Sequence, residues 1–219
     1  MTKPIKIDFK KTEKEYYYPK KIETITVPEM TYLTVSGEGD PAGEAFQKAI
    51  GLLYPIAYTI SMSYKKEDYK IPGFYNFVVP PLEGLWTSKE APKEGQVLNK
   101  EELIWKIMLR MPDFVTEEVV DWAKHEATLR KREDFSSVTY EKIADGLCVQ
   151  AMHIGPFAEE ATTFTQMEEF AKAEGLALIH KTYHHREIYL SDFRKTVPEK
   201  LKTVLRQYAV VKDNYEVKK

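Results

Sequence analysis

The sequence predicts an α+β protein in which a strand–helix–strand–strand pattern occurs twice. Helical apolar spacings alternate with short strand-like runs in the same order in both halves of the chain. Two short sequence similarities support this repeat. Residues 39–41 resemble residues 154–156, and residues 84–88 resemble residues 187–191. We expect duplicated βαββ units that form a pseudo-symmetric antiparallel sheet with helices on one face, plus a helical insertion.

The length and composition indicate one globular domain. The chain has 219 residues, of which 43% are hydrophobic and 30% charged, an ordinary composition for a folded protein. The expected parts of this single domain are an N-terminal arm (1–23), a first βαββ unit (24–88), a helical insertion (89–135), and a second βαββ unit with a C-terminal helix (136–219).

The charge balance limits the kinds of binding partner, and the cysteine count indicates the cellular compartment. With 32 Lys+Arg and 34 Asp+Glu, the net charge of −2 gives no general attraction to nucleic acid or to an anionic membrane. The arm is too short for a helix-turn-helix, and no apolar run is long enough to span a membrane. A single cysteine, Cys148, and the absence of a secretory signal lead us to expect a cytoplasmic protein.

In the first unit, the pattern predicts a strand over 30–36 and then a helix. Asp40 is the expected N-cap and Pro41 the first helical residue. Apolar residues at spacings of three and four continue the helix to Leu53, and the pattern extends past Pro55. Two strands are expected next, over 74–79 and 82–87.

The residue pattern of the insertion predicts two helices. Asn99 followed by Glu102 has the spacing of a capping box, so we expect a helix over 99–111 with Leu103, Ile107 and Met111 on one face. A second helix is expected over 116–132.

The second unit repeats the first pattern. A strand is expected over 147–154, and a helix from Gly155-Pro156 ends at Gly175. The remaining expected elements are strands over 176–181 and 183–190, a short helix over 198–206 and a last strand over 208–211.

The strand over 183–190 carries the most informative side chains. Because side chains alternate across a strand, Tyr183, His185, Glu187 and Tyr189 share one face. In the related strand of the first unit, Trp86 takes the place of Tyr189. This face offers a carboxylate, a histidine and aromatic rings, which suits an aromatic or cationic ligand. The solvent face of an ordinary strand explains the same pattern equally well.

No metal or cofactor is expected. His184 and His185 are adjacent on a strand and point to opposite faces, so they are poorly placed to share an ion. No glycine-rich phosphate loop with a lysine follows a strand, so nucleotide binding has no motif here.

Several segments resemble the stand-alone branch of the GyrI-like small-molecule-binding proteins. The similarity extends over nearly the whole chain from about Ile22. The segments that carry it are Glu83-Gly84-Leu85-Trp86, Trp105-Lys106-Ile107-Met108, Met111-Pro112-Asp113-Phe114-Val115-Thr116, Met152-His153-Ile154-Gly155-Pro156-Phe157, His185-Arg186-Glu187-Ile188-Tyr189-Leu190-Ser191-Asp192 and Pro198-Glu199-Lys200-Leu201-Lys202-Thr203. One departure is Phe193, where the family usually has proline, which changes the expected shape of the loop after the strand.

This resemblance implies a fold of two SHS2-type βαββ units and a ligand site at Glu187. Some family members are effector domains of AraC-type and MerR-type regulators, in which the matching glutamate faces lipophilic, often cationic drugs. A stand-alone subfamily hydrolyses the cyclopropane ring of cyclopropanoid DNA-alkylating antibiotics within an aromatic cage, without a metal or cofactor. This chain is similar to that subfamily in length and in its Trp-bearing insertion.

The resemblance also implies roles for individual residues. Glu187 would orient or deprotonate the attacking water, and Tyr189 would steady the developing phenolate. A lipophilic aromatic ligand would be held by a set of surrounding side chains, namely Trp86, Trp105, Phe157, Tyr183, His185 and His153.

Three classes of function remain open on the sequence. The first is a xenobiotic hydrolase acting on cyclopropanoid compounds. The second is a non-catalytic binder that sequesters or senses lipophilic or cationic ligands. The third is a role in protein interaction, such as inhibition of gyrase, or in haem carriage. The sequence fixes neither the natural substrate, nor the oligomeric state, nor whether residues 89–135 close over a pocket.

Overall fold

The computed structural model describes residues 5–89 and 99–212, and their contacts divide the chain into two compact units. The first unit comprises Met1–Thr12, Met30–Pro80 and Ser88–Ile143. The second comprises Glu13–Glu29, Pro81–Thr87 and Ala144–Lys219. Two long strands, β1 (Glu23–Glu38) and β4 (Thr139–Ile154), contribute residues to both units.

The first unit is built on an antiparallel strand pair covered by a long helix. β1 pairs with β3 (Leu103–Met111) from Thr31↔Met111 to Glu38↔Ile104. Helix α3 (Glu44–Ser61) packs against β3 and against α4 (Glu117–Lys131), and its buried residues include Phe46, Leu53 and Ile60. The short elements of this unit are α1 (Phe9–Thr12) and the 3-10 turns η1 (Ser63–Lys65) and η2 (Lys100–Glu102).

The helix expected over 99–111 is wrong, because most of that segment is strand β3. Ile107 to Met111 are all buried, so both faces of the strand are covered and the polar alternation of a half-exposed strand is missing. The four-residue apolar spacing fits such a strand as well as it fits a helix. Asn99 is an N-cap, since its Oδ1 accepts from the Glu101 N–H at 3.2 Å, but it opens only the turn η2.

Two further expectations for the first unit need correction. Helix α3 begins at Glu44 with Gly43 as its N-cap, whereas Asp40 Oδ1 accepts from the Ala42 N–H at 2.8 Å in the turn before it. Residues 74–79 do not form the expected strand, and there Phe77 alone makes a bridge, parallel to Ile7. Their aromatic rings instead pack around Phe114, and Pro80 and Pro81 cannot donate to a ladder.

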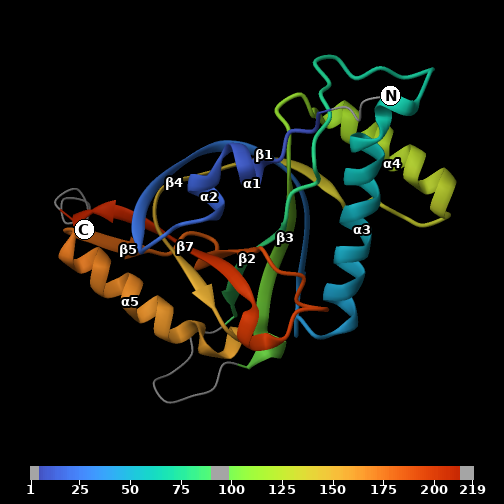
Figure 1. Cartoon of the computed structure of the whole chain (residues 1–219). Coiled ribbons are helices and arrows are strands. Elements are labelled where there is room, and N and C mark those ends of the chain that lie inside the picture. The colour runs from blue at the N-terminus through green and yellow to red at the C-terminus, as the bar shows by residue number, and fades with distance from the viewer. Residues whose placement is uncertain (1–4, 90–98, 213–219) are drawn as a thin grey trace. The chain divides into compact units, whose positions relative to one another are not determined.

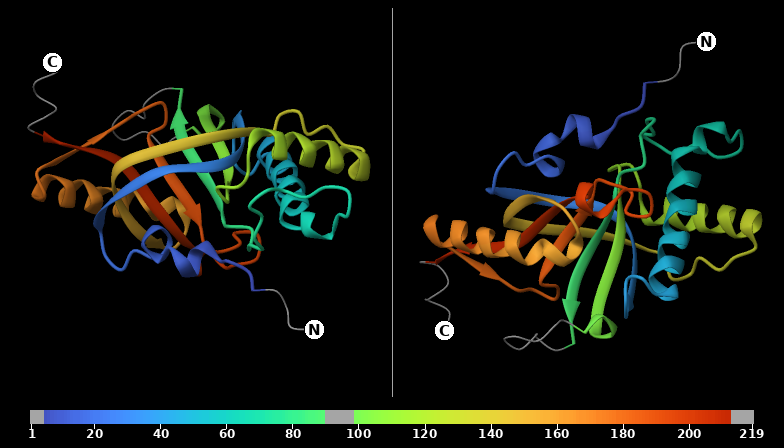
Figure 2. Two further views of the ribbon diagram at one scale, coloured as in Figure 1. Left: turned by 90° about the horizontal axis from the view of Figure 1, so that it is seen from above. Right: turned by 60° about the horizontal axis from the view of Figure 1, so that its bottom comes forward.

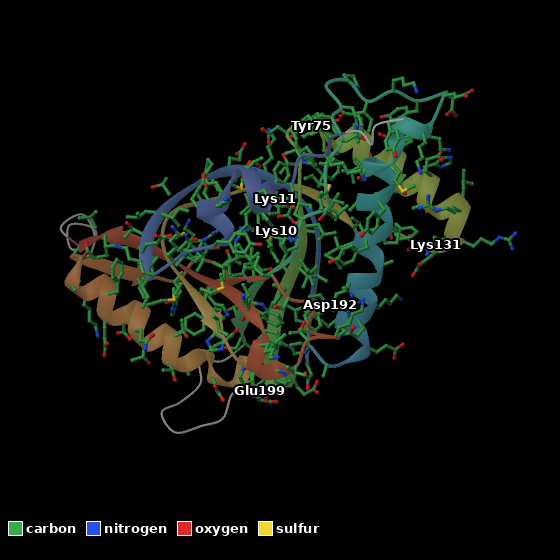
Figure 3. All side chains as sticks on the ribbon, in the orientation of Figure 1. Lys10, Lys11, Tyr75, Lys131, Asp192 and Glu199 are labelled. Carbon is green, nitrogen blue, oxygen red and sulfur yellow. The ribbon has the colours of Figure 1, made fainter. Side chains whose placement is uncertain are left out.

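Helix α4 matches the helix expected over 116–132. Thr116 is the N-cap and accepts from the Val119 N–H, and Arg132 ends the helix with a positive φ of 56°. Figure 3 shows the Lys131 side chain extending away from the end of this helix. Arg130 is different, because its Nη2 donates to Thr59 Oγ1 of α3 at 2.9 Å.

The second unit is an antiparallel arrangement around β7 (Lys202–Val211), as can be followed in Figure 1. β4 pairs with β7 from Cys148↔Tyr208 to Ile154↔Lys202. β5 (Leu176–Ile179) and β6 (His185–Tyr189) pair with successive parts of β7, and β2 (Leu82–Ser88) pairs with β6. The short elements are α2 (Lys14–Tyr17), η3 (Phe157–Glu159) and η4 (Pro198–Lys200).

Helix α5 (Glu160–Ala173) covers the second unit's strands and lies beside β5 in both views of Figure 2. Its apolar face contributes to a compact cluster of fully or nearly fully buried side chains: Val149, Ala151, Met167, Ala171, Leu176, Leu205 and Ala209. As expected, the chain leaves the helix through Gly175, whose φ of +70° favours glycine.

The helix expected over 198–206 is also wrong. Only the turn η4 is helical, and β7 begins at Lys202. The physical reason is the one that applies to β3: residues 203–206 are all buried, and β7 has strand partners on β4 and β6.

The predicted α+β class with antiparallel strands is confirmed. In chain order, the elements read β1-α3-β2-β3 and then β4-α5-β5/β6-β7, so the first repeat ends in a strand that was expected to be a helix, and the second ends in a strand of which only 208–211 was expected. The expected division into one domain with an arm and an insertion remains a prediction, and residues 1–4 and 90–98 of those segments lie outside the described residues. Within the part of the chain that the structure describes, no helix combines the length and apolar character needed to cross a membrane.

Candidate functional site

Glu187 lies on β6 in the second unit and is only 8% exposed. Its two oxygens are held by neighbours from the same strand face. The Tyr189 hydroxyl donates to Oε2 at 2.7 Å, and His185 Nε2 lies 2.9 Å from Oε1. The strand alternation expected from the sequence therefore does bring these three side chains together.

Trp86 joins this group from the neighbouring strand β2. Its indole Nε1–H donates to the Tyr189 hydroxyl oxygen at 2.9 Å. Gly84 makes this contact possible, because it lies opposite Glu187 and a Cβ at position 84 would be 2.6 Å from Trp86 Nε1. The result is a chain of hydrogen bonds from Trp86 through Tyr189 to Glu187.

A second buried carboxyl group, Glu160, completes the cluster. It is the first residue of α5, is 7% exposed and shares a hydrogen bond with Glu187. Burial, together with the negative charge of Glu187, raises the pKa of Glu160 to about 10. Glu160 is therefore neutral near pH 7 and is the donor in that bond. Among the described residues, its Oε1 has no hydrogen-bond partner.

The sequence analysis missed Glu160, although the sequence carries a signal. Glu160 falls on the apolar stripe of its helix, at spacings of four and seven before Phe164 and Met167. A carboxyl group on the buried face of a helix is unusual and points to a paired or neutral acid.

Tyr189 is a hydrogen-bond donor under all ordinary conditions. Burial is the main reason that its pKa lies well above the usual tyrosine value, and the adjacent Glu187 charge acts in the same direction. Its proton is directed at Glu187, so the hydroxyl orients that carboxyl group.

Three aromatic rings meet beside the carboxyl pair. Phe157 and Phe193 each approach Tyr189 edge-on, with ring centroids 5.9 and 5.7 Å away, and lie 6.3 Å from one another. Phe157 is 41% exposed, so part of its ring is free to contact a ligand. On the other side of the cluster, Phe164 meets the His185 ring edge-on at 4.8 Å.

Phe193 is presented by a turn that its neighbours fix. Asp192 Oδ1 accepts from the Arg194 backbone N–H at 3.1 Å and from Arg194 Nε at 3.0 Å. These bonds are the main reason that the pKa of Asp192, labelled in Figure 3, falls to about 2. The loop that departs from the family pattern thus supplies a third ring to the aromatic group.

His153 is placed differently from the other expected site residues. Its Nε2 lies 3.1 Å from the Pro156 carbonyl oxygen, which can only accept, so Nε2 donates. Its Nδ1 lies 2.9 Å from Thr163 Oγ1 on α5. Both ring nitrogens are thereby used to join the end of β4 to the start of the helix that carries Glu160.

Two other expected ligand-binding residues make no contact with Glu187 among the interactions described. Trp105 belongs to the first unit, where its buried ring meets Phe46 edge-on at 5.1 Å and leaves no room for a side chain at Gly37. Tyr183 lies in the bend before β6 and is half-buried. The assignment of these two residues to ligand binding stays a prediction.

The opposite face of β6 holds a buried network of charges. Arg186 is 1% exposed, and its Nη1 and Nη2 donate to Glu83 Oε2 at 2.6 Å and Asp145 Oδ1 at 2.8 Å. Arg206 of β7 in turn donates to Gln150 Oε1 of β4 at 2.9 Å. These contacts join β2, β4, β6 and β7 directly behind Glu187.

The described residues were also compared with the arrangement of side chains that a metal ion requires. Among the described residues, no group of three or more His, Cys, Asp or Glu side chains is arranged to hold a metal ion.

This combination of an α+β fold and a buried carboxyl pair beside aromatic rings is that of a small-molecule-binding protein. The GyrI-like small molecule binding domain matches residues 20–206, and the chain belongs to the GyrI-like family. No match was found among curated proteins.

Solved structures agree with this assignment. A protein from Listeria innocua described as a hydrolase is 48% identical over 94% of this chain and 100% of its own, with a TM-score of 0.86. An uncharacterized conserved protein from Listeria innocua is 49% identical over the same shares, with a TM-score of 0.87. The C-terminal domain of EcmrR shares the fold alone, at 15% identity over 86% of this chain and 96% of its own, with a TM-score of 0.51.

Proposed function

We propose that this protein binds lipophilic aromatic compounds and hydrolyses the cyclopropane ring of cyclopropanoid DNA-alkylating agents. The observation that carries the proposal is the hydrogen-bonded pair of Glu160 and Glu187, in which one carboxyl group is held neutral beside the other. In such a pair, the neutral carboxyl group is the hydrogen-bond donor and the ionised carboxylate is the base, although the two groups are chemically identical. The Listeria innocua relative described as a hydrolase adds support at the level of the reaction class.

In the proposed reaction, Glu187 is the general base. It takes a proton from water while the water oxygen bonds to a ring carbon. The strained carbon–carbon bond breaks, and its electron pair moves through the conjugated dienone to the oxygen, which takes a proton from solvent. Glu187 returns its proton to solvent, so the net change is the addition of one water molecule.

Glu160 and Tyr189 are assigned to the placement of that base. Neutral Glu160 donates its hydrogen bond to Glu187 and so helps to fix the carboxylate that acts on the water. Tyr189 donates to Glu187 Oε2, which keeps the other oxygen of Glu187 directed toward His185 and the reacting water. Correct placement of the reactants accounts for a large share of the rate enhancement in such a site.

The aromatic rings would hold the flat body of the ligand. Phe157 and Phe193 flank Tyr189, and Trp86 lies behind it, so a planar ligand would meet ring edges and faces close to the carboxyl pair.

The test is turnover of a duocarmycin-type compound in water enriched in oxygen-18, followed by mass spectrometry. The wild-type protein is expected to give a ring-opened product that contains one labelled oxygen. Glu187→Gln should lower kcat by about 10²–10⁴-fold, the usual contribution of a general base. Gly51→Ala on α3, where a Cβ meets nothing within 4 Å, is the matched control and should keep full activity.

Two outcomes would overturn parts of the proposal. Absence of labelled product with the wild-type protein would remove the hydrolase activity. Unchanged turnover in Glu187→Gln would remove the role of that residue as the base.

Binding without turnover is the second candidate function. A carboxyl group beside partly exposed aromatic rings also suits a lipophilic cation, which gains from both the charge and the ring faces. Saturable binding of a cationic dye, with no change in the mass of any cyclopropanoid compound, would favour this function over hydrolysis.

A further inference from the structure

Strands β5 and β6 lie end to end along one edge of β7, because β4 occupies the other edge as far as Tyr208. Ile179, at the end of β5, pairs with Tyr208. Arg186, near the start of β6, pairs with Arg206. Residues 180–185 therefore lie opposite a single residue of β7, so the chain must loop out of the strand between these two pairs.

Two histidines close this loop. The rings of His180 and His184 stack, with centroids 4.3 Å apart and planes inclined by 29°, and residues 181–183 bulge out between them. The backbone N–H of His184 donates to the Trp86 carbonyl oxygen of β2 at 2.7 Å. The next residue, His185, contacts Glu187. The stack is thus adjacent in the chain to the side chain that meets the Glu187 carboxylate.

The stack tolerates only one positive charge. Two neutral imidazoles, or one neutral and one protonated ring, can stack, whereas two imidazolium rings at this distance repel one another. Burial, together with the charges of His180 and His185, holds the pKa of His184 below its usual value of 6.5. The folded loop therefore disfavours the proton. Its stability is fully present above pH 6.5 and is lost as pH falls through the lowered pKa of His184.

No carboxylate among the described residues is placed to neutralise a second proton on the stack. The charged side chains around it and its loop are His185 of β6, Lys181 of the loop, Glu168 and Lys172 of α5, Lys212 after β7 and Asp145 of β4. Both carboxylates in this set already have cationic partners. Glu168 pairs with Lys172 at 2.9 Å, and Asp145 pairs with Arg186 at 2.8 Å.

We infer that the His180–His184 stack is a pH-dependent switch on the Glu187 site, closed while at most one of the two imidazoles is protonated. When both are protonated, the rings separate, residues 181–183 lose their anchor and His184 releases the Trp86 carbonyl. His185 then loses its fixed position beside Glu187, and aromatic ligands bind less tightly in acid. This inference rests on the proposed ligand site at Glu187 but not on hydrolysis.

The first measurement needs no ligand. The scalar coupling between the His184 amide nitrogen and the Trp86 carbonyl carbon exists only while that hydrogen bond is formed, and NMR of the full-length protein can follow it between about pH 8 and pH 5. The wild type should lose the coupling in acid. His180→Phe keeps a ring that can stack but removes one charge, so it should retain the coupling. His125→Phe, at an exposed position of α4 in the first unit, is the matched control and should behave as the wild type.

The second measurement is the affinity for N-phenyl-1-naphthylamine, a neutral aromatic probe that becomes fluorescent on binding. Uptake of one proton changes an affinity by up to about tenfold per pH unit. We expect a fall of about tenfold between pH 8 and pH 5 in the wild type and His125→Phe, and of less than about threefold in His180→Phe. His180→Ala, which removes the ring, should bind the probe at pH 8 as weakly as the wild type does at pH 5.

The same pH dependence of the coupling and of the affinity in the wild type and His180→Phe would overturn the switch. So would wild-type affinity of His180→Ala at pH 8. Loss of the coupling in acid only where His180 is present, with no probe bound at any pH, would support the switch and contradict the proposed binding of lipophilic compounds.

Discussion

At the scale of single residues, the hydrogen bonding and orientation of the Glu187 carboxylate depend on its neighbours. Tyr189 and Glu160 donate hydrogen bonds to it, and Trp86 holds Tyr189 in turn. Gly84 contributes by lacking a side chain, since it leaves the space in which the indole and the phenol meet. Each of these contributions can be removed separately.

Gly84→Ala is expected to disrupt the site through a single methyl group. The new Cβ would lie 2.6 Å from Trp86 Nε1 and 3.0 Å from the Tyr189 hydroxyl, so the hydrogen bond between them must break or shift. We expect a loss of about 1–3 kcal/mol in the free energy of unfolding, typical of overpacking. Ligand binding or turnover should fall at least tenfold.

Urea unfolding and a ligand titration measure the two effects. Gly51→Ala is again the control, because that helical position is open and alanine there should add about 0.5–1 kcal/mol to stability. Equal behaviour of the two variants would contradict the role given to Gly84.

Glu160 should make stability depend on pH in a defined direction. Its pKa is raised from 4.5 in the unfolded chain to about 10 in the folded protein, so the folded state binds the extra proton between these values. The free energy of unfolding should therefore decrease as pH rises, by up to about 1.4 kcal/mol per pH unit from this group.

Glu160→Gln isolates this effect, because the amide keeps the size of the side chain but does not titrate. Unfolding in urea from pH 6 to pH 9 should give a shallower pH dependence in the variant than in the wild type. Identical slopes would show that Glu160 is not held neutral.

At the scale of secondary-structure elements, the success of the predictions depended on how many faces of each element are buried. Helix α4 buries one face, and its helical apolar spacing was visible in the sequence. Strands β3 and β7 are buried on both faces over residues 107–111 and 203–206, so these stretches lack the alternation of buried and exposed residues that marks a half-buried strand. Without that alternation a strand is hard to distinguish from a helix, which is why 99–111 and 198–206 were assigned wrongly, whereas 208–211 was correctly expected to be a strand.

The N-cap of α4 can be tested directly. Thr116 Oγ1 accepts from the Val119 N–H, so Thr116→Ala leaves an unpaired donor at the start of the helix. We expect a loss of about 1 kcal/mol, within the usual range for such caps, measured by thermal or urea unfolding. Thr116→Ser keeps the hydroxyl and should retain most of the stability, and a loss as large as that of alanine would argue against capping.

At the scale of the whole molecule, the chain carries two copies of one element pattern but only one carboxyl pair of this kind among the interactions described. In the second unit, the strand that holds Glu187 is joined to its neighbours on the opposite face by Arg186, Glu83, Asp145 and Arg206. The backbone before β1 is tied to the same network, because Arg206 Nη2 donates to the Tyr16 carbonyl at 2.9 Å.

Arg186→Met is expected to destabilise the protein by about 3–5 kcal/mol. The substitution leaves Glu83 and Asp145 as buried carboxylates without their main partner, which is the costly way to break a buried ion pair. The matched control is Arg194→Met, because the Arg194–Asp192 pair is exposed to solvent and should contribute no more than about 1 kcal/mol. Similar losses in the two variants, measured by urea unfolding, would contradict this account.

The sequence by itself determined the α+β class, the order of the repeats and the family resemblance. It also placed His185, Glu187 and Tyr189 on one strand face, because alternation is a local property of extended backbone. The tertiary structure alone decided that Glu160 meets Glu187, that Trp86 bonds to Tyr189, and that Trp105 packs within the first unit. These contacts join elements far apart in the chain, and they depend on which faces become buried, which local sequence patterns do not specify.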